Sequence, residues 1–215
     1  MDIILTPEEI RVLGSLLEKE MSTPEYYPLT LNALVAACNQ KTSRSPVVSY
    51  DEKTLLSALA RLEKKRLVWQ SSLGRVTKYE QSFVKNTKLI NSEAAVLSML
   101  MLRGPQTIGE IKAHTERLYD FADLEKVNEA LLDLIEAGFI VKSPRMPGQK
   151  ESRYNHLLSG QPENISPEVP GSAAMDSTIQ EGDESITEIK EELKALRRDF
   201  EDLKLKMTAF MEQFK

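Results

Sequence analysis

The chain has little cysteine and no long hydrophobic run. Cys38 is the single cysteine among 215 residues, so no disulfide can form within the chain, which suits a reducing compartment. No apolar stretch approaches the ~18 residues that a membrane span needs, and the first five residues lack the basic flank of a signal peptide. We therefore expect a cytoplasmic protein without membrane association.

Histidine is almost as scarce. His114 and His156 are the only two, and neither has the sequence spacing of a metal site or a catalytic triad, so we expect both to be surface or hydrogen-bonded residues. The polar stretch 39–46 contains no glycine, which excludes a P-loop. It reads as an ordered loop that either anchors a phosphate or forms a structural turn. We accordingly expect no catalytic residues, no metal and no cofactor.

The charge is unevenly distributed. The formal net charge is −5, yet residues 1–90 carry 13 basic and 10 acidic groups, a net of +3. Residues 91–160 have a net of −2, and residues 161–215 have a net of −6. Because a phosphate backbone attracts a basic surface, only the N-terminal part has the charge that nucleic acid requires.

Residues 1–85, the first repeat, predict three helices followed by a β-hairpin. Capping signals predict that the helices begin at Thr6, Thr30 and Ser49. The first helix should extend to about Met21. Leucines at helical spacing form the expected buried face of the third helix: Leu55, Leu59 and Leu62. The stretches 67–69 and 76–79, separated by a turn at Gly74, predict the hairpin.

Residues 86–158, the second repeat, follow the same order at a constant offset of 72 residues. The offset maps the leucine face of the third helix onto Val127, Leu131 and Leu134. A capping box of Thr107 and Glu110 opens the second helix, the third begins near Asp123, and Gly138 is expected to end it. The predicted hairpin pairs residues 139–141 with residues 152–154.

This element order indicates the fold class. Three helices and a hairpin are typical of a winged helix, so we expect a mainly α chain with small β-hairpins (α+β), built as two tandem winged-helix domains. Two repeats of ~75 residues bury modest cores, and we expect them to pack on one another. The alternative is an unrelated α+β domain whose periodicity is coincidental.

Three motifs resemble the bacterial YceH family. They are the stretches Thr23–Leu29, Asn39–Val47 and Pro147–Arg153, within a match over residues 5–160. The resemblance implies a tandem winged-helix fold and no established activity. Members of that family often carry a histidine where this chain has Gln81, so a role of that histidine elsewhere in the family does not carry over to this chain by resemblance.

The third helix of the first repeat predicts a basic face. At about 100° per residue, its polar side chains fall opposite the leucines. In a winged helix that reads DNA, this face enters the major groove, while the hairpin contacts the flanking backbone. With the preceding loop and the hairpin, the candidate DNA-binding residues are Lys41, Arg44, Lys53, Ser57, Arg61, Lys64, Lys65, Arg75 and Lys78. The alternative is an ordinary solvated surface.

The equivalent face of the second repeat is acidic and would repel phosphate. We expect it to bind a protein partner or a second subunit, and its residues are Glu125, Glu129, Asp133 and Glu136. The hairpin of this repeat keeps basic residues, so a contact with DNA by that hairpin alone stays open: Arg145, Lys150 and Arg153. Here too, a solvated surface is the alternative.

The C-terminal part predicts a linker and a coiled coil. Residues 159–185 are acidic, contain three prolines and have few large apolar groups, as is typical of a disordered linker. Residues 186–215 have apolar side chains alternating at spacings of three and four. The predicted seam consists of Ile186, Ile189, Leu193, Leu196, Phe200, Leu203, Met207 and Phe210. It predicts self-association, or alternatively a helix that docks on its own domains.

Two functional hypotheses follow. The first is a dimeric, cytoplasmic DNA-binding regulator that uses the third helix and hairpin of the first repeat. The second is a protein-interaction module without direct DNA contact, as in tandem winged-helix subunits of chromosome-organising complexes. A third hypothesis, an enzyme, would need a metal or cofactor that nothing in the sequence predicts.

Overall fold

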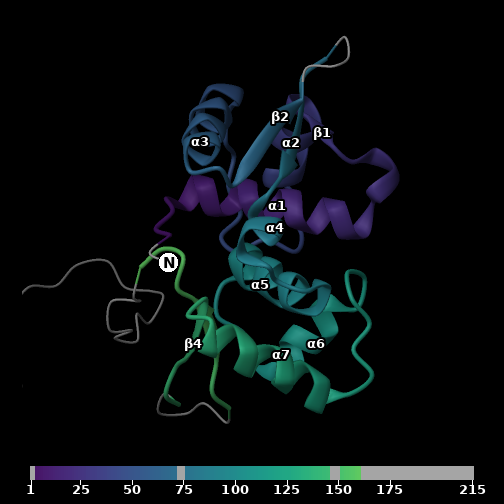
Figure 1. Ribbon diagram of the computed structural model, residues 1–215, viewed down its shortest axis with the longest axis vertical. Helices are drawn as coiled ribbons and strands as arrows, with labels where there is room; N and C mark the ends of the chain where they lie inside the picture. Colours follow the sequence, from purple (N-terminus) through teal and green to yellow (C-terminus); the bar gives the residue numbers. More distant parts are fainter. Residues whose placement is uncertain (1–2, 72–75, 146–150, 161–215) are drawn as a thin grey trace, which may run out of the picture. The chain divides into compact units, whose positions relative to one another are not determined.

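The computed structural model describes residues 3–71, 76–145 and 151–160 (Figure 1). The predicted coiled-coil seam, Arg75, Lys150 and nearly all of the predicted linker lie outside the described residues. Within them, the fold is mixed α and β, with helices in the majority and small antiparallel sheets. None of the described helices is long and apolar enough to cross a membrane.

The first repeat contains the predicted three helices and hairpin. Its elements are α1 (Pro7–Ser22), the 3-10 turn η1 (Pro24–Tyr26), β1 (Leu29–Thr30), α2 (Leu31–Cys38), α3 (Glu52–Lys64), β2 (Val68–Ser71), β3 (Lys78–Gln81) and α4 (Phe83–Thr87). The strands form an antiparallel sheet in the order β1-β3-β2. The sequence did not reveal β1, because two residues are too few to show an alternating pattern.

Side-chain caps fix where these helices begin. The predicted capping box at the start of α1 is confirmed, since the Thr6 amide donates to Glu9 Oε2 at 2.7 Å. Thr30 caps α2 as predicted. The prediction for α3 is wrong by two residues: the cap is Asp51, not Ser49, and the Thr54 amide donates to Asp51 Oδ1 at 2.8 Å. A carboxylate at this end also interacts favourably with the helix dipole.

The second repeat has the same order of helices and hairpin. Its elements are α5 (Asn91–Arg103), α6 (Ile108–Thr115), α7 (Leu124–Glu136), β4 (Ile140–Lys142) and β5 (Tyr154–His156). The capping box of Thr107 and Glu110 and the positive φ of Gly138 (75°) are as predicted. The second strand of the hairpin lies two residues later than predicted, because Ile140 pairs with His156 and Lys142 with Tyr154.

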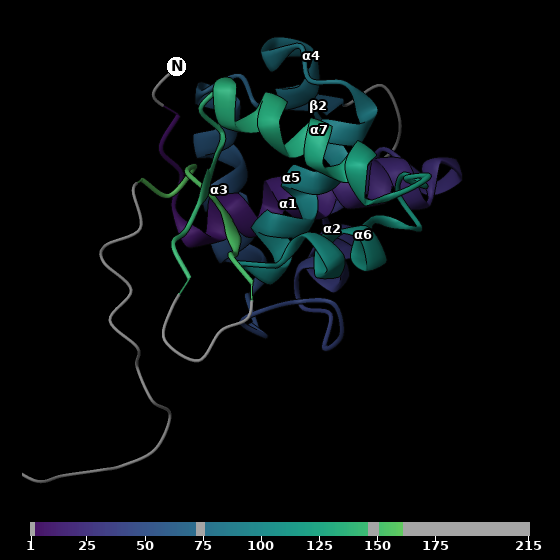
Figure 2. The same ribbon diagram turned by 90° about the horizontal axis from the view of Figure 1, so that it is seen from below.

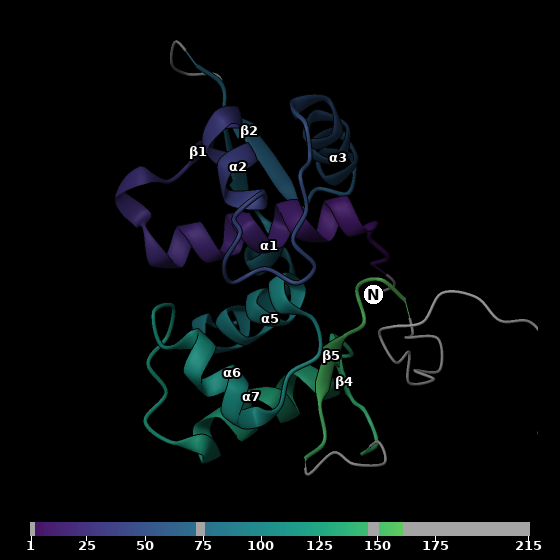
Figure 3. The ribbon, with the colours of Figure 1, turned by 180° about the vertical axis from the view of Figure 1, so that it is seen from behind.

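Helices α1 and α5 pack against each other at the centre of the fold. They lie side by side in all three views (Figures 1, 2 and 3). Both are buried around most of their circumference, over residues 9–18 and 94–102. Gly14 permits the close approach, because a Cβ added there would lie 3.1 Å from the Leu102 side chain and 3.2 Å from Met101 Cβ.

The core is continuous across the two repeats. One cluster of buried apolar side chains contains the leucines of α3 as well as Val127, Leu131 and Leu134 of α7. Phe83 of α4 packs edge-on against Phe139, with ring centroids 5.7 Å apart. In the loop before α3, the Ser45 amide donates to the Leu102 carbonyl at 2.9 Å. Buried apolar area is the main stabilising contribution in such a core.

Candidate nucleic-acid interface

The outer face of α3 is exposed and basic at its centre. Leu55, Leu59 and Leu62 are buried in the core, so the opposite side of the helix faces solvent. The side chains at the centre of that side, all exposed, are Lys53, Leu56, Ser57, Ala60 and Lys64. None of them is acidic. We name this set the α3 face.

Two other predicted residues of α3 are already engaged. Arg61 Nε lies 3.3 Å from Glu9 Oε1, and Lys65 Nζ lies 2.9 Å from Glu9 Oε2. The Glu9 side chain is 0% exposed, and a buried carboxylate without such partners would strongly destabilise the fold. The two cations therefore serve first as counter-ions of α1, which distinguishes them from Lys53 and Lys64.

Burial removes Arg44 from the predicted interface. Its side chain is 0% exposed and holds Glu18 through two hydrogen bonds, Nη1 to Oε1 at 3.0 Å and Nη2 to Oε2 at 2.6 Å. It also donates to the Ala37 carbonyl from Nε and Nη2. In this arrangement Arg44 fastens the loop before α3 to α1, so within the stretch 39–46 this residue has a structural role. Asn39 has one as well, because it exchanges two hydrogen bonds with the Tyr50 backbone.

The remaining predicted residues lie on three other segments. Lys78 is exposed on β3, Arg75 lies outside the described residues, and Lys41 lines a separate hollow near the end of α5. Of the nine predicted residues, the structure thus brings Lys53, Ser57 and Lys64 together on the α3 face, with Lys78 on the neighbouring hairpin.

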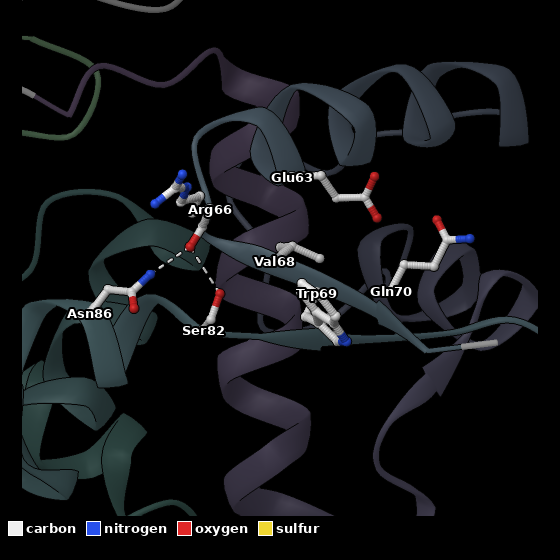
Figure 4. Close-up of a pocket in the computed structure, with 7 residues that line it drawn as sticks. All are labelled: Glu63, Arg66, Val68, Trp69, Gln70, Ser82 and Asn86. Atoms are coloured by element: carbon white, nitrogen blue, oxygen red, sulfur yellow. Dashed lines mark hydrogen bonds between the residues drawn. The ribbon is translucent and has the colours of Figure 1, made fainter. Parts of the chain in front are cut away.

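Sequence reasoning missed an exposed tryptophan beside α3. Trp69 on β2 is 64% exposed and lines a hollow of about 550 Å³ with Glu63, Val68 and Gln70 (Figure 4). At the other end of this hollow, Ser82 Oγ and Asn86 Nδ2 donate to the Arg66 carbonyl. The alternation of a strand was the available signal, because an inward Val68 requires an outward Trp69.

The acidic face of α7 is exposed as well. Glu125, Glu129, Asp133 and Glu136 all face solvent, and two leucines are exposed beside them, Leu124 and Leu132. Lys126 donates to both oxygens of Glu129, at 2.8 and 2.7 Å. We name these four carboxylates with the two leucines the α7 face.

The second hairpin offers less to DNA than the sequence predicts. Arg145 is exposed, but Arg153 Nη1 lies 2.9 Å from Glu110 Oε2 and also donates to the Pro105 carbonyl. This ion pair ties the hairpin to the first turn of α6, so Arg153 has a structural partner.

The two histidines differ in their surroundings. His114 Nδ1 lies 2.6 Å from Gln106 Oε1, as expected of a hydrogen-bonded residue. His156 departs from that expectation, because it is buried and its Nδ1 has no partner among the described residues. Burial lowers the pKa of His156 to about 4. Within residues 3–71, 76–145 and 151–160, no three His, Cys, Asp or Glu side chains gather as metal ligands would.

Gln81 holds a structural position between α1 and α4. Its Nε2 donates to Glu20 Oε2 at 2.6 Å, its Oε1 accepts from the Val84 amide, and its own amide donates to the Tyr27 hydroxyl. Burial raises the pKa of Glu20, which the hydrogen bond from Gln81 partly offsets. A neutral amide satisfies these partners without a further charge.

Sequence comparisons with known proteins all point to the same protein family. Residues 5–149 match the family model described as "Protein of unknown function, DUF480". The chain belongs to the DUF480 family. A UPF0502 protein of Solibacter usitatus is 47% identical over 206 residues, which cover 94% of this chain and all of that protein. A UPF0502 protein of Geotalea uraniireducens is 42% identical over the full length of both chains.

Proposed function

We propose that this DUF480 protein binds duplex DNA through its first repeat, which we interpret as a winged-helix domain with α3 as the helix that enters the major groove. The supporting observation is the α3 face, where Lys53 and Lys64 lie exposed with Ser57 between them and no carboxylate at the centre. The equivalent order of helices and hairpin in the second repeat, and the resemblance to the YceH family, support a tandem winged-helix fold.

The spacing of the two lysines suits this proposal. They are eleven positions apart, which is three helical turns, or roughly 16 Å along the axis. A helix fits into the major groove, and long lysine side chains near its two ends can reach phosphates of the groove walls. Ser57 and the small apolar Ala60 lie between them, where a hydroxyl can bond a base edge and a methyl group can contact thymine.

The hairpin can add backbone contacts. Lys78 is exposed on β3, and Trp69 is exposed on the paired strand, where its ring is free to contact a sugar or a base. In this reading the overall charge of −5 does not oppose binding, because the acidic excess lies mainly in residues 161–215.

A salt titration tests the proposal. We expect the full chain to bind a generic duplex in a fluorescence-anisotropy assay at low salt, with affinity falling as salt rises. The double variant Lys53→Gln, Lys64→Gln removes two phosphate contacts and should lower the slope of log K against log salt by about 1.8.

The matched control is Lys85→Gln, Lys88→Gln, which changes the charge equally at two exposed lysines around α4. Its slope should stay unchanged. Absence of binding by the unmodified chain at 50 mM salt, or an equal loss in the control, would overturn the proposal.

A second candidate function rests on the α7 face. Four carboxylates beside exposed Leu124 and Leu132 favour a protein partner with a basic rim and an apolar centre. We propose it as the alternative without direct DNA contact. A single stoichiometric protein captured from an extract cleared of nucleic acid, and lost with Leu132→Lys but not with Lys53→Gln, Lys64→Gln, would favour this candidate.

We also propose that the protein is cytoplasmic, non-enzymatic and self-associating through residues 186–215. Cys38 is buried in the core, and burial raises the pKa of its thiol to about 11, which disfavours the thiolate that a nucleophile requires. Light scattering of the full chain at increasing concentration tests self-association, and a constant monomer mass would contradict it.

A further inference from the structure

A polar hollow of about 660 Å³ lies at the C-terminal end of α1. The loop residues 40–43 form one wall, the end of α5 another, and α6 with the turn after it a third. Both repeats therefore contribute to it. Its volume is within the range of small-molecule sites, roughly 300–1,000 Å³.

Positive charge predominates in this hollow. Four cationic side chains line it: Lys19, Lys41, Arg103 and Arg117. Two carboxylates also line it, Glu18 and Glu116. Glu18 forms an ion pair with the buried Arg44, and Lys19 Nζ lies 3.5 Å from Glu18 Oε2. Because Glu18 is matched by Arg44, the only other lining carboxylate among the described residues that can balance the four lining cations is Glu116.

Two residues of the wall each carry a buried polar atom without a hydrogen-bond partner among the described residues. Arg103 Nη2 donates to Ser43 Oγ at 2.7 Å, but its Nε is buried without a hydrogen-bond partner among the described residues. Ser22 Oγ is buried without a partner as well. A buried donor without an acceptor is costly, and a shift of either side chain toward the hollow would let it bond an acceptor there.

Burial and neighbouring charges shift the pKa values of two residues that line the hollow. Burial lowers the pKa of Arg103; the charge of Glu18 opposes this shift, and that of Arg44 adds to it. Burial, followed by the charge of Arg103, lowers the pKa of His114, which Glu110 partly offsets. An anion placed beside Arg103 would offset the desolvation of its guanidinium.

We propose that this hollow is a binding site for a small, multiply charged phosphate compound, held by Arg103, Arg117, Lys41 and Lys19. A guanidinium presents a planar fork of donors that matches phosphate oxygens, and lysines add point charges. The exposed Thr42, which lines the same wall, supplies a hydroxyl as a further donor. The site is separate from the α3 face, so it does not depend on DNA binding.

Calorimetric titration of the full chain with inorganic pyrophosphate, in the absence of DNA, tests the site. We expect saturable binding with one site per chain. Arg117→Gln removes an exposed guanidinium and should weaken binding at least tenfold, because a charge-assisted hydrogen bond contributes that much. Arg103→Gln should weaken it by at least as much, and a thermal melt will show whether that variant is folded.

Lys53→Gln on the α3 face is the matched control and should bind pyrophosphate like the unmodified chain. Citrate in place of pyrophosphate separates a phosphate site from a general anion site: citrate of equal affinity would overturn the phosphate assignment. Equal weakening by Lys53→Gln and Arg117→Gln, or no heat at about 10 mM pyrophosphate, where even millimolar affinity would register, would overturn the site altogether.

Discussion

Among the described residues of the first repeat, four buried residues carry charge: Glu9, Arg11, Glu18 and Arg44. Among the described residues of the second repeat, the buried polar groups are instead neutral at pH 7: Ser92, Ser98, Gln106, Thr115 and His156. The two repeats share an order of elements but stabilise their central helices differently. The basic residues of the first repeat therefore fall into two groups. Some are counter-ions of buried carboxylates, and others are free to contact a ligand.

The largest expected effect comes from breaking a buried pair. Arg44→Ala leaves Glu18 buried with Lys19 as its nearest cation, and removing one partner of a buried pair costs about 3 kcal/mol or more. Urea denaturation should show this loss in the free energy of unfolding. Lys41→Ala, three residues earlier and exposed, should change it by less than about 0.5 kcal/mol. Similar losses in the two variants would show that the pair does not stabilise the fold.

The buried histidine of the second repeat should make stability depend on pH. Burial lowers the pKa of His156 from its ordinary value of 6.5 to about 4, so between these pH values the unfolded chain binds more protons. The contribution of His156 to the free energy of unfolding is fully present above pH 6.5 and decreases as the pH falls toward 4. From pH 7 to 5 the loss should be about 2 kcal/mol. His156→Leu should remove that part of the pH dependence, and an unchanged difference between the two pH values would exclude His156 as its source.

Two glycines give a smaller contrast. Gly14→Ala pushes a methyl group to within 3.1 Å of Leu102, and such overpacking costs about 1–3 kcal/mol. In α6 of the second repeat, Gly109 has no atom within 4 Å of an added Cβ, so Gly109→Ala should stabilise by about 0.5 kcal/mol. Thermal melts of both variants should shift in opposite directions. A stabilised Gly14→Ala chain would mean that α1 and α5 can separate at little cost.

The smallest expected change in stability comes from exchanging the charges of the two faces. Lys53→Glu with Lys64→Glu, or Glu129→Lys with Asp133→Lys, alters exposed side chains only, and each pair should change the free energy of unfolding by less than about 0.5 kcal/mol. The first pair should abolish DNA binding at 100 mM salt while the fold persists. A large destabilisation by either pair would show that these faces are packed in the native protein.

The sequence predicted the elements well where local chemistry decides them. Thr6 with Glu9 and Thr107 with Glu110 marked two helix starts correctly, because a capping box is complete within four residues. It failed for β1, which exists only through its pairing with Tyr79 and Lys78, about 50 residues away.

The candidate site was harder to predict for the same reason. Lys65 and Glu9 lie 56 residues apart in sequence, and Arg44 and Glu18 lie 26 apart. A helical wheel places side chains on a face but does not show which carboxylate from another helix will meet them. Lys53 and Lys64 were placed correctly on an exposed face, because the burial of the leucines on the other side decides their direction.

Glu9 both caps the start of α1 and forms ion pairs with α3. One of its oxygens accepts the Thr6 amide that begins α1, and its carboxylate also holds Arg61 and Lys65 of α3. A polyanion that pulls Arg61 and Lys65 outward must break their ion pairs with Glu9, the residue that keeps the first turn of α1 from fraying. Ligand occupancy would then be reported at a distance, as faster amide hydrogen exchange in the first turn of that helix.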